Sequence, residues 1–140
     1  MPRYMLDTNI ISALMLDPRG VCARRVLEVP EDQLCTSEIV RGELHFGIDK
    51  KRETNPERAG QLTHHFDRVF SRLVVHGLDG RASFRYGQLR AYLEKTGNLI
   101  GVNDLWIAGH AIALECVVVT DNVKDFGRVP NLHVENWLRS

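Results

Sequence analysis

The sequence predicts an α/β fold in which a central parallel sheet is flanked by helices. Short apolar runs alternate along the chain with longer segments whose apolar residues recur at helical spacing. This alternation is typical of parallel strands joined by right-handed helical crossovers. Carboxylates follow two of the runs, at Asp7 and Asp121. Because ligands bind outside the carboxyl ends of parallel strands, these positions indicate a site at that edge of the sheet.

The first predicted strand covers residues 4–6 and ends abruptly at Asp7-Thr8-Asn9. Apolar residues at 10, 11, 14 and 15 then predict a helix, which the sequence Asp17-Pro18-Arg19-Gly20 ends. Short oxygen-bearing side chains commonly cap such a helix. Residues 7–9 therefore have two readings, a helix cap and a functional site.

The later elements are predicted from the same periodicities and from residues that end helices, among them Pro30 and Gly97. In the first half of the chain we expect a helix over 21–29, a strand at 34–35, a helix capped by Thr36 or Ser37, an exposed charged turn over 49–58 around Asn55-Pro56, and a helix to about 72. In the second half we expect a strand over 73–75, helices over 79–95 and 103–114, and a strand over 116–119. A short turn with Phe126 and an edge strand over 132–134 should follow. Trp137 is expected to pack the terminus.

Length and composition favour one cytoplasmic domain spanning residues 1–140, with no membrane association. Cys22, Cys35 and Cys116 are odd in number and form no C-x-x-C pair, so we expect reduced thiols in the core. The apolar runs are far shorter than a membrane span, and the amino terminus has no signal-peptide pattern.

The charge balance does not by itself indicate a nucleic-acid-binding protein. Lys and Arg number 18 and Asp and Glu also number 18, so the formal net charge is zero. A metal-dependent nuclease nevertheless contains acidic ligands, which offset its basic contacts in such a count. Arg81 with Arg85, and the run over 50–52, are candidate phosphate contacts, although solvated surface charge is the commoner role.

Four carboxylates are placed to reach one end of the predicted sheet: Asp7, Glu43, Asp104 and Asp121. Mg²⁺ takes oxygen ligands, keeps several waters and needs only one or two direct carboxylates. Bound there, the ion would turn a water molecule into a nucleophile and neutralise charge that develops on a phosphate. The pattern therefore predicts metal-dependent phosphoryl chemistry.

Each acid also has a structural interpretation. Asp104 at the start of a helix is favoured by the helix dipole whatever its function, and Asp121 can simply form a turn. Glu43 is harder to explain in this way, because a carboxylate on a largely apolar helix should be exposed, paired or bound to metal. The combination carries more weight than any single residue.

Other catalytic classes find little support in the sequence. The histidines show no H-E-x-x-H or similar metal spacing, and we expect them on the surface or in the core. No G-x-S-x-G, Walker or G-x-G-x-x-G pattern occurs. Trp106 could stack a base, but core packing is the commoner role of such a residue.

Four motifs in order resemble one known family. They are Met5-Leu6-Asp7-Thr8-Asn9; Gly42-Glu43-Leu44 with Phe46-Gly47; Gly101-Val102-Asn103-Asp104-Leu105 with His110-Ala111; and Val119-Thr120-Asp121-Asn122 with Phe126. Together they resemble the PIN-domain ribonucleases, specifically the VapC toxins of bacterial type II toxin-antitoxin pairs. The resemblance runs nearly end to end.

The resemblance implies a PIN-like three-layer sandwich and an acidic metal site made of Asp7, Glu43, Asp104 and Asp121. Thr8 and Asn9 would support that site. Members of this family cleave RNA endonucleolytically with Mg²⁺ or Mn²⁺ and commonly form homodimers, so the resemblance implies the same activity and assembly here. It also implies a cognate antitoxin partner whose tail covers the acidic pocket.

Two alternatives remain open from the residues. A phosphohydrolase that resembles the haloacid dehalogenase type also places an Asp after its first strand, but it expects a second Asp where this chain has Asn9. A catalytically silent RNA-binding or partner-binding module could use the same fold. Mutually repelling acids at four positions count against such a module.

Overall fold

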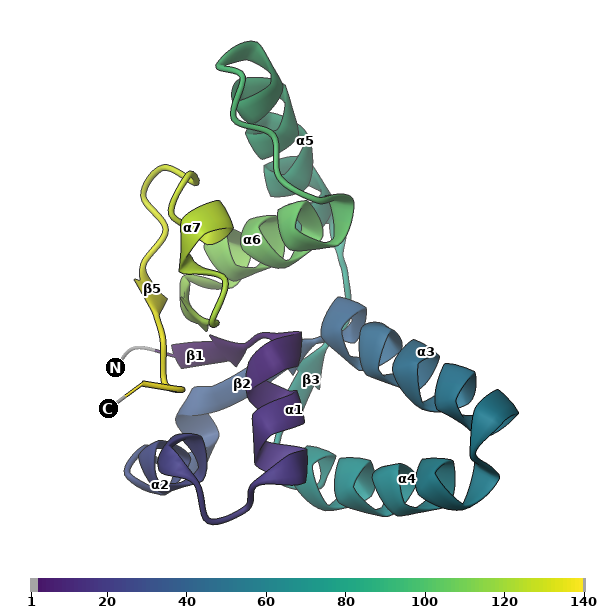
Figure 1. Ribbon diagram of the computed structural model, residues 1–140. Coiled ribbons are helices and arrows are strands. Elements are labelled where there is room, and N and C mark those ends of the chain that lie inside the picture. Colours follow the sequence, from purple (N-terminus) through teal and green to yellow (C-terminus); the bar gives the residue numbers. More distant parts are fainter. Residues whose placement is uncertain (1–2, 140) are drawn as a thin grey trace.

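The structure is a computed structural model that describes residues 3–139. Its centre is a parallel sheet of five strands in the order β3-β2-β1-β4-β5 (Figure 1). The strands are β1 (Arg3–Leu6), β2 (Leu34–Ser37), β3 (Val74–His76), β4 (Cys116–Val119) and β5 (Val134–Glu135). Because β1 is the central strand, the residue that follows it lies at the middle of the sheet's carboxyl edge.

Helices cover both sides of this sheet. They are α1 (Thr8–Leu16), α2 (Val21–Leu27), α3 (Glu38–Thr54), α4 (Pro56–Phe70), α5 (Gly80–Lys95), α6 (Val102–Leu114) and α7 (Val123–Phe126). Figure 1 shows α1, α2 and α4 on one side of the sheet and α6, with α5 projecting from it, on the other. The predicted α/β class, a three-layer sandwich with a central parallel sheet, is confirmed.

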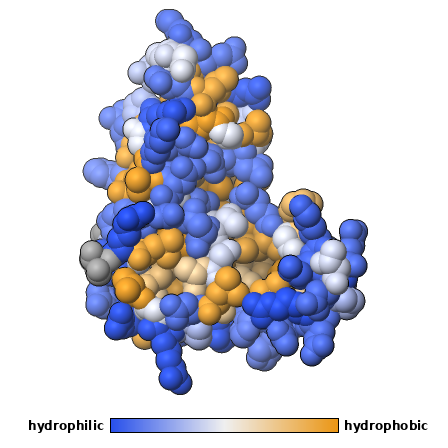
Figure 2. All heavy atoms as spheres, in the orientation of Figure 1, coloured by the Kyte–Doolittle hydropathy of each residue, from blue (hydrophilic) through white to orange (hydrophobic). Residues whose placement is uncertain are grey.

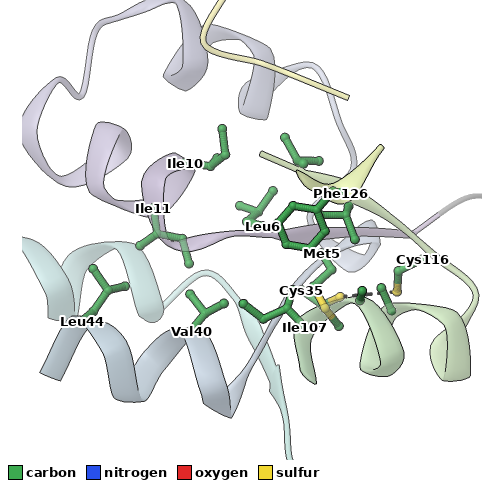
Figure 3. Close-up of a cluster of buried hydrophobic side chains, with 14 of the residues drawn as sticks. Met5, Leu6, Ile10, Ile11, Cys35, Val40, Leu44, Ile107, Cys116 and Phe126 are labelled. Atoms are coloured by element: carbon green, nitrogen blue, oxygen red, sulfur yellow. Dashed lines mark hydrogen bonds between the residues drawn. The ribbon is translucent and has the colours of Figure 1, made fainter. Parts of the chain in front are cut away.

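The core forms where β1 is covered on both faces. Met5 and Leu6 are fully buried, and successive strand residues point to opposite faces. Figure 3 shows Ile10 and Ile11 of α1 on one side of β1, and Ile107 of α6 on the other. This two-sided burial explains why β1 is an unbroken apolar run rather than an alternating one.

The cysteines are core residues with free thiols, as predicted. All three are buried, and the Sγ atoms of Cys35 and Cys116 lie 3.8 Å apart on one face of the sheet (Figure 3). Burial raises the pKa of Cys22 to about 11, so its thiol is unreactive at neutral pH.

The exposed turn predicted over 49–58 was wrong in extent. The charged residues extend α3 to Thr54, α4 begins at Pro56, and only Asn55 separates the two helices. The Asn55 side chain caps α4 by accepting a hydrogen bond from the backbone N–H of Arg58 at 3.0 Å. Pro56 is the first residue of α4, where the N–H that proline lacks would have no partner within the helix. The strong surface charge belongs to the outer faces of a helical hairpin.

The carboxyl-terminal region also differs in detail from the prediction. Phe126 is fully buried and ends the short helix α7 rather than lying in a turn. The last strand covers Val134 and Glu135, so it begins two residues later and ends one residue later than expected. These two residues pair with Val118 and Val119 of β4. Trp137 is buried and stacks at an angle on Tyr4, with 5.1 Å between ring centroids, as its predicted packing role requires. Along residues 3–139, no helix is both long enough and apolar enough to cross a membrane.

Candidate active site

Asp7 lies at the carboxyl end of the central strand and is only 4% exposed. Its side chain caps α1 by accepting from the Thr8 N–H at 2.8 Å, so the capping interpretation is correct as well. The same carboxylate accepts from the Thr120 hydroxyl at 2.7 Å and from the Asn9 amide at 3.3 Å. These donors fix the carboxylate in one orientation at the sheet edge.

Burial raises the pKa of Asp7 above its ordinary value, and the charge of Glu43 raises it further. The hydrogen bonds from Thr120, Thr8 and Asn9 act in the opposite direction, because they stabilise the carboxylate. The net rise means that folding holds Asp7 where its negative charge is costly. A cation at this position would relieve that cost.

Glu43 reaches the same edge from α3. It is half-buried, and its carboxylate accepts a hydrogen bond from the Thr8 hydroxyl at 2.9 Å. Thr8 thus contacts Asp7 through its backbone and Glu43 through its side chain. The Glu43 carboxylate is therefore paired with a hydroxyl group and lies beside Asp7.

Asp104 lies in the first turn of α6, and its pKa is raised to about 6. Burial is the largest cause, followed by the negative charges of Asp7, Glu43 and Asp125. These charges act over short distances in a partly buried site, so the four carboxylates belong to one electrostatic cluster.

Asp125 was missing from the sequence prediction. The Asn122 amide donates to Asp104 at 3.2 Å and to Asp125 at 3.2 Å, and so holds the two carboxylates on either side of one amide group. Asn122 is the N-cap of α7 and Asp125 lies three residues later, in the first turn of that helix. Recognising residues 123–126 as a helix would have revealed this pair.

The Asp121 side chain does not turn toward that cluster. Its carboxylate accepts from the Asn136 amide at 2.9 Å and lies 3.9 Å from Arg139. Only its backbone joins the site, since the Asp121 N–H donates to the side-chain Oδ1 of Asn9 at 2.9 Å. The structure therefore brings Asp7, Glu43 and Asp104 together and places Asp121 beside them, with its side chain exposed.

Thr120 is a second residue that the sequence prediction overlooked. It is fully buried, donates to Asp7 and accepts from the Asn122 N–H at 2.9 Å. The available signal was its place between the last residue of β4 and two polar residues at the same sheet edge. Together with Asn9, it links the residues that follow β1 with those that follow β4.

The donor set fits a hard divalent cation. Within residues 3–139, none of Asp7, Glu43 and Asp104 forms a salt bridge with a basic side chain. A cluster of carboxylate oxygens without a paired cation is the chemistry that Mg²⁺ and Mn²⁺ select. In this part of the chain, no three His, Cys, Asp or Glu side chains already enclose an ion position.

A hollow of about 240 Å³ adjoins the acidic cluster. Its walls come from α1, α3 and α4 and include Thr8, Glu43, Leu16 and Leu62. A larger groove of about 350 Å³ lies between α1, α2 and α4 and is lined mostly by apolar side chains. Figure 2 shows hydrophobic surface gathered over this part of the molecule.

The remaining candidates are arranged as follows. Arg81 and Arg85 are exposed on α5, and the basic run over 50–52 is exposed on α3. Trp106 is half-buried and stacks on Tyr86 with 3.9 Å between ring centroids, in agreement with a packing role. Among the histidines, His110 is buried and contacts Ser37.

Comparison with known proteins agrees with this architecture. The PIN domain family matches residues 4–132. A ribonuclease VapC2 of Rickettsia felis is 40% identical over 137 residues, which cover 96% of this chain and 97% of the relative. A tRNA(fMet)-specific endonuclease VapC of Salmonella typhimurium is 36% identical over 138 residues, which cover 98% and 99%.

A solved structure gives the same result. VapBC2 from Rickettsia felis, bound to a DNA fragment from their promoter, superposes with a TM-score of 0.84 at 38% identity and covers 96% of this chain and 98% of that chain. The resemblance seen in the sequence motifs is thereby confirmed over nearly the whole length of the chain. The chain belongs to the PIN-domain family, among the VapC ribonucleases.

Proposed function

We propose that this chain is a metal-dependent endoribonuclease that acts as the toxin of a toxin-antitoxin pair. The observation that carries this proposal is the cluster of Asp7, Glu43 and Asp104 at the carboxyl edge of the sheet, where the pKa values of both aspartates are raised. Membership among the VapC ribonucleases supports the same activity.

Asp7, Glu43 and Asp104 would hold Mg²⁺ or Mn²⁺. Asp125, which the Asn122 amide holds beside Asp104, would add negative charge near the ion. When bound, such an ion lowers the pKa of a coordinated water and stabilises charge on the scissile phosphate. Thr120, Thr8 and Asn9 keep the Asp7 carboxylate aimed at the site. Asp121 would act at longer range, through a metal-bound water or through its backbone tie to Asn9.

RNA is the proposed substrate, and a transfer RNA is the first one to test. The Salmonella typhimurium relative is named a tRNA(fMet)-specific endonuclease. Exposed Arg81 and Arg85 on α5 would contribute phosphate contacts.

A cognate antitoxin and a second copy of this chain are the proposed partners. The similar Rickettsia felis structure is that of VapBC2, a toxin with its antitoxin. The hollow beside Glu43 is lined mostly by apolar side chains, and a partner segment bound there would block access to the acidic cluster. Exposed Phe84 (62%) and Tyr92 (50%) on α5 favour a homodimer, since such apolar surface marks association sites.

The test is cleavage of total cellular RNA by the purified, antitoxin-free chain in Mg²⁺ or Mn²⁺. We expect discrete fragments that disappear with EDTA and with Asp7→Asn. Asp32→Asn is the matched control, because this exposed acid precedes β2 at the opposite edge of the sheet and should cut normally.

Intact RNA with folded, metal-loaded protein, or normal cleavage by Asp7→Asn, would refute the acidic-site mechanism. RNA that is bound but never cut would favour the catalytically silent binding module instead. End mapping of the fragments would identify the substrate.

A further inference from the structure

His110 joins the two helices that carry Glu43 and Asp104. It lies on α6 and is only 1% exposed. Its Nδ1 atom is 2.9 Å from the hydroxyl of Ser37, which is fully buried at the end of β2. Ser37 is also the residue that caps α3, since its Oγ accepts from the Ile39 N–H at 3.2 Å.

The need of a buried hydroxyl proton for an acceptor assigns the direction of this hydrogen bond. The Ser37 oxygen accepts from Ile39, and among the described residues His110 Nδ1 is the group placed to receive its proton. The backbone of Gly77, which leads from β3 into α5, lies near enough to raise the pKa of the ring slightly. With Nδ1 as the acceptor, Nε2 carries the proton of the neutral ring. Burial and neighbouring His76 lower the pKa of His110, in agreement with this neutral ring.

The ring therefore connects α6 to Ser37 through Nδ1 and lies against β3. His76 lies beside it, because its position pairs with Ser37 in the β2–β3 register and its ring is 6.3 Å from the His110 ring. A hydrophobic residue would fill this volume, but it would leave the buried Ser37 hydroxyl without its acceptor.

The connection is placed to control the spacing of the acids. Ser37 precedes Glu43 by six residues on α3, and Asp104 precedes His110 by six residues on α6. Six helical residues rise only about 9 Å, so a tie at Ser37 and His110 fixes how the two carboxylates face each other. A displacement of about 1 Å between metal-holding groups is enough to lower a catalytic rate about a hundredfold.

We propose that His110 is a positioning residue of the acidic site, which acts through the Ser37 hydroxyl to hold the start of α3 against α6. This inference rests on the proposed function. It assigns a role to a buried histidine that touches neither the substrate nor the acids.

Two amide substitutions separate this role from simple core packing. In His110→Asn the side-chain oxygen stands near the position of Nδ1 and can still accept from Ser37, whereas the longer side chain of His110→Gln places its amide near the position of Nε2 instead. We expect His110→Gln to lower kcat and to weaken Mn²⁺ binding by about tenfold or more, with KM for RNA little changed. His110→Asn should recover most of both losses.

Ser37→Ala tests the same contact from the other side. It should cost at least as much as His110→Gln, since it also removes the cap of α3. The double variant should be no worse than Ser37→Ala alone, because the contact between the two side chains is already lost in that variant. Val69→Ala, a buried substitution on α4 that touches none of these groups, is the control for lowered stability and should keep the wild-type kcat.

Kinetics and Mn²⁺ titration calorimetry provide separate readouts. Wild-type Mn²⁺ affinity and kcat in both His110→Gln and Ser37→Ala would overturn the positioning role even if the protein is a nuclease. Equal losses in the Asn and Gln variants would also overturn it, since packing alone would then explain the effect. If the wild type fails to cut RNA, the proposed function fails, and the calorimetry still decides whether His110 organises the acids.

Discussion

At the scale of single residues, the site depends on charges that folding makes unfavourable. Asp7 and Asp104 are both held in positions that raise their pKa values, first through burial and then through the charge of Glu43, with Asp7 also acting on Asp104. Thr120, Thr8 and Asn122 reduce the cost by donating hydrogen bonds, but no basic group within residues 3–139 pairs with these acids. Carboxylates with raised pKa values and no basic partner are typical of functional sites, including those that bind metal ions.

Asp104 should therefore destabilise the metal-free protein at neutral pH. Its folded pKa of about 6 lies above the ordinary value of 3.8, so the folded protein binds the proton more tightly than the unfolded chain does. Its contribution to stability is full below about pH 4 and is lost as the pH rises toward about 6. We expect Asp104→Asn to raise the free energy of unfolding by about 2 kcal/mol at neutral pH and by nothing near pH 3.

Urea denaturation in EDTA across this pH range is the measurement. Asp32→Asn serves again as a control, since that residue is exposed and remote from the cluster. An Asp104→Asn effect that is independent of pH would contradict the electrostatic explanation. Added Mg²⁺ should reverse the order of the two proteins, because only the wild type retains the ligand.

At the scale of elements, the close approach of α5 and α6 supports the helix that carries Asp104. A Cβ atom at Gly109 would lie 2.8 Å from the backbone nitrogen of Tyr86 and 3.0 Å from its Cα. The ring of Tyr86 then stacks on Trp106 of α6 with an interplanar angle of 9°. Gly109 thus allows α5 to pack closely against α6, although the rest of α5 projects away from the sheet (Figure 1).

Gly109→Ala should separate these helices. The added methyl group meets backbone rather than a movable side chain, so we expect a net loss of about 1–3 kcal/mol in unfolding free energy despite the better helix propensity of alanine. Gly87→Ala on the exposed side of α5 is the matched control, since nothing lies within 4 Å of its Cβ position. That variant should be unchanged or more stable by up to about 1 kcal/mol. Thermal or urea unfolding measures both, and equal effects would show that the close approach is unimportant.

At the scale of the whole molecule, strand order gathers the site. β1 lies between β2 and β4, so Asp7, the start of α3 and Thr120 meet at one edge although they are far apart in sequence. The hollow beside Glu43 opens at the same place, between α1, α3 and α4. A partner that fills this hollow would cover the acids without altering them.

Leu16→Glu should weaken inhibition by the cognate antitoxin while leaving cleavage intact. Leu16 is 59% exposed and lines the hollow. Full burial of a leucine contributes about 1.5–3 kcal/mol, so its replacement by a charge should raise the inhibition constant by about tenfold to a hundredfold. Leu99→Glu, at an exposed leucine between α5 and α6, is the control and should leave inhibition unchanged. Inhibition titrations of RNA cleavage decide between these outcomes, and unaltered inhibition of Leu16→Glu would place the partner elsewhere.

The sequence by itself determined the layered α/β fold, most helices and strands, and Asp7, Glu43 and Asp104 as candidate ligands. It could do so because apolar periodicity and chain order specify which residues face the core and which end a parallel strand. That Asp121 binds metal, and that residues 1–140 form one domain, stay predictions.

Only the tertiary structure decided which polar groups serve those acids. Thr120, Asn122 and Asp125 reach them across the sheet edge, and His110 meets Ser37 from 73 residues away. Beyond the end of β4 the Asp121 side chain turns toward Asn136, and on α7 the Asp125 side chain turns toward Asn122. No local pattern encodes these pairings, because they depend on how α3, α6 and α7 pack around the sheet and on where each short side chain finds a buried partner.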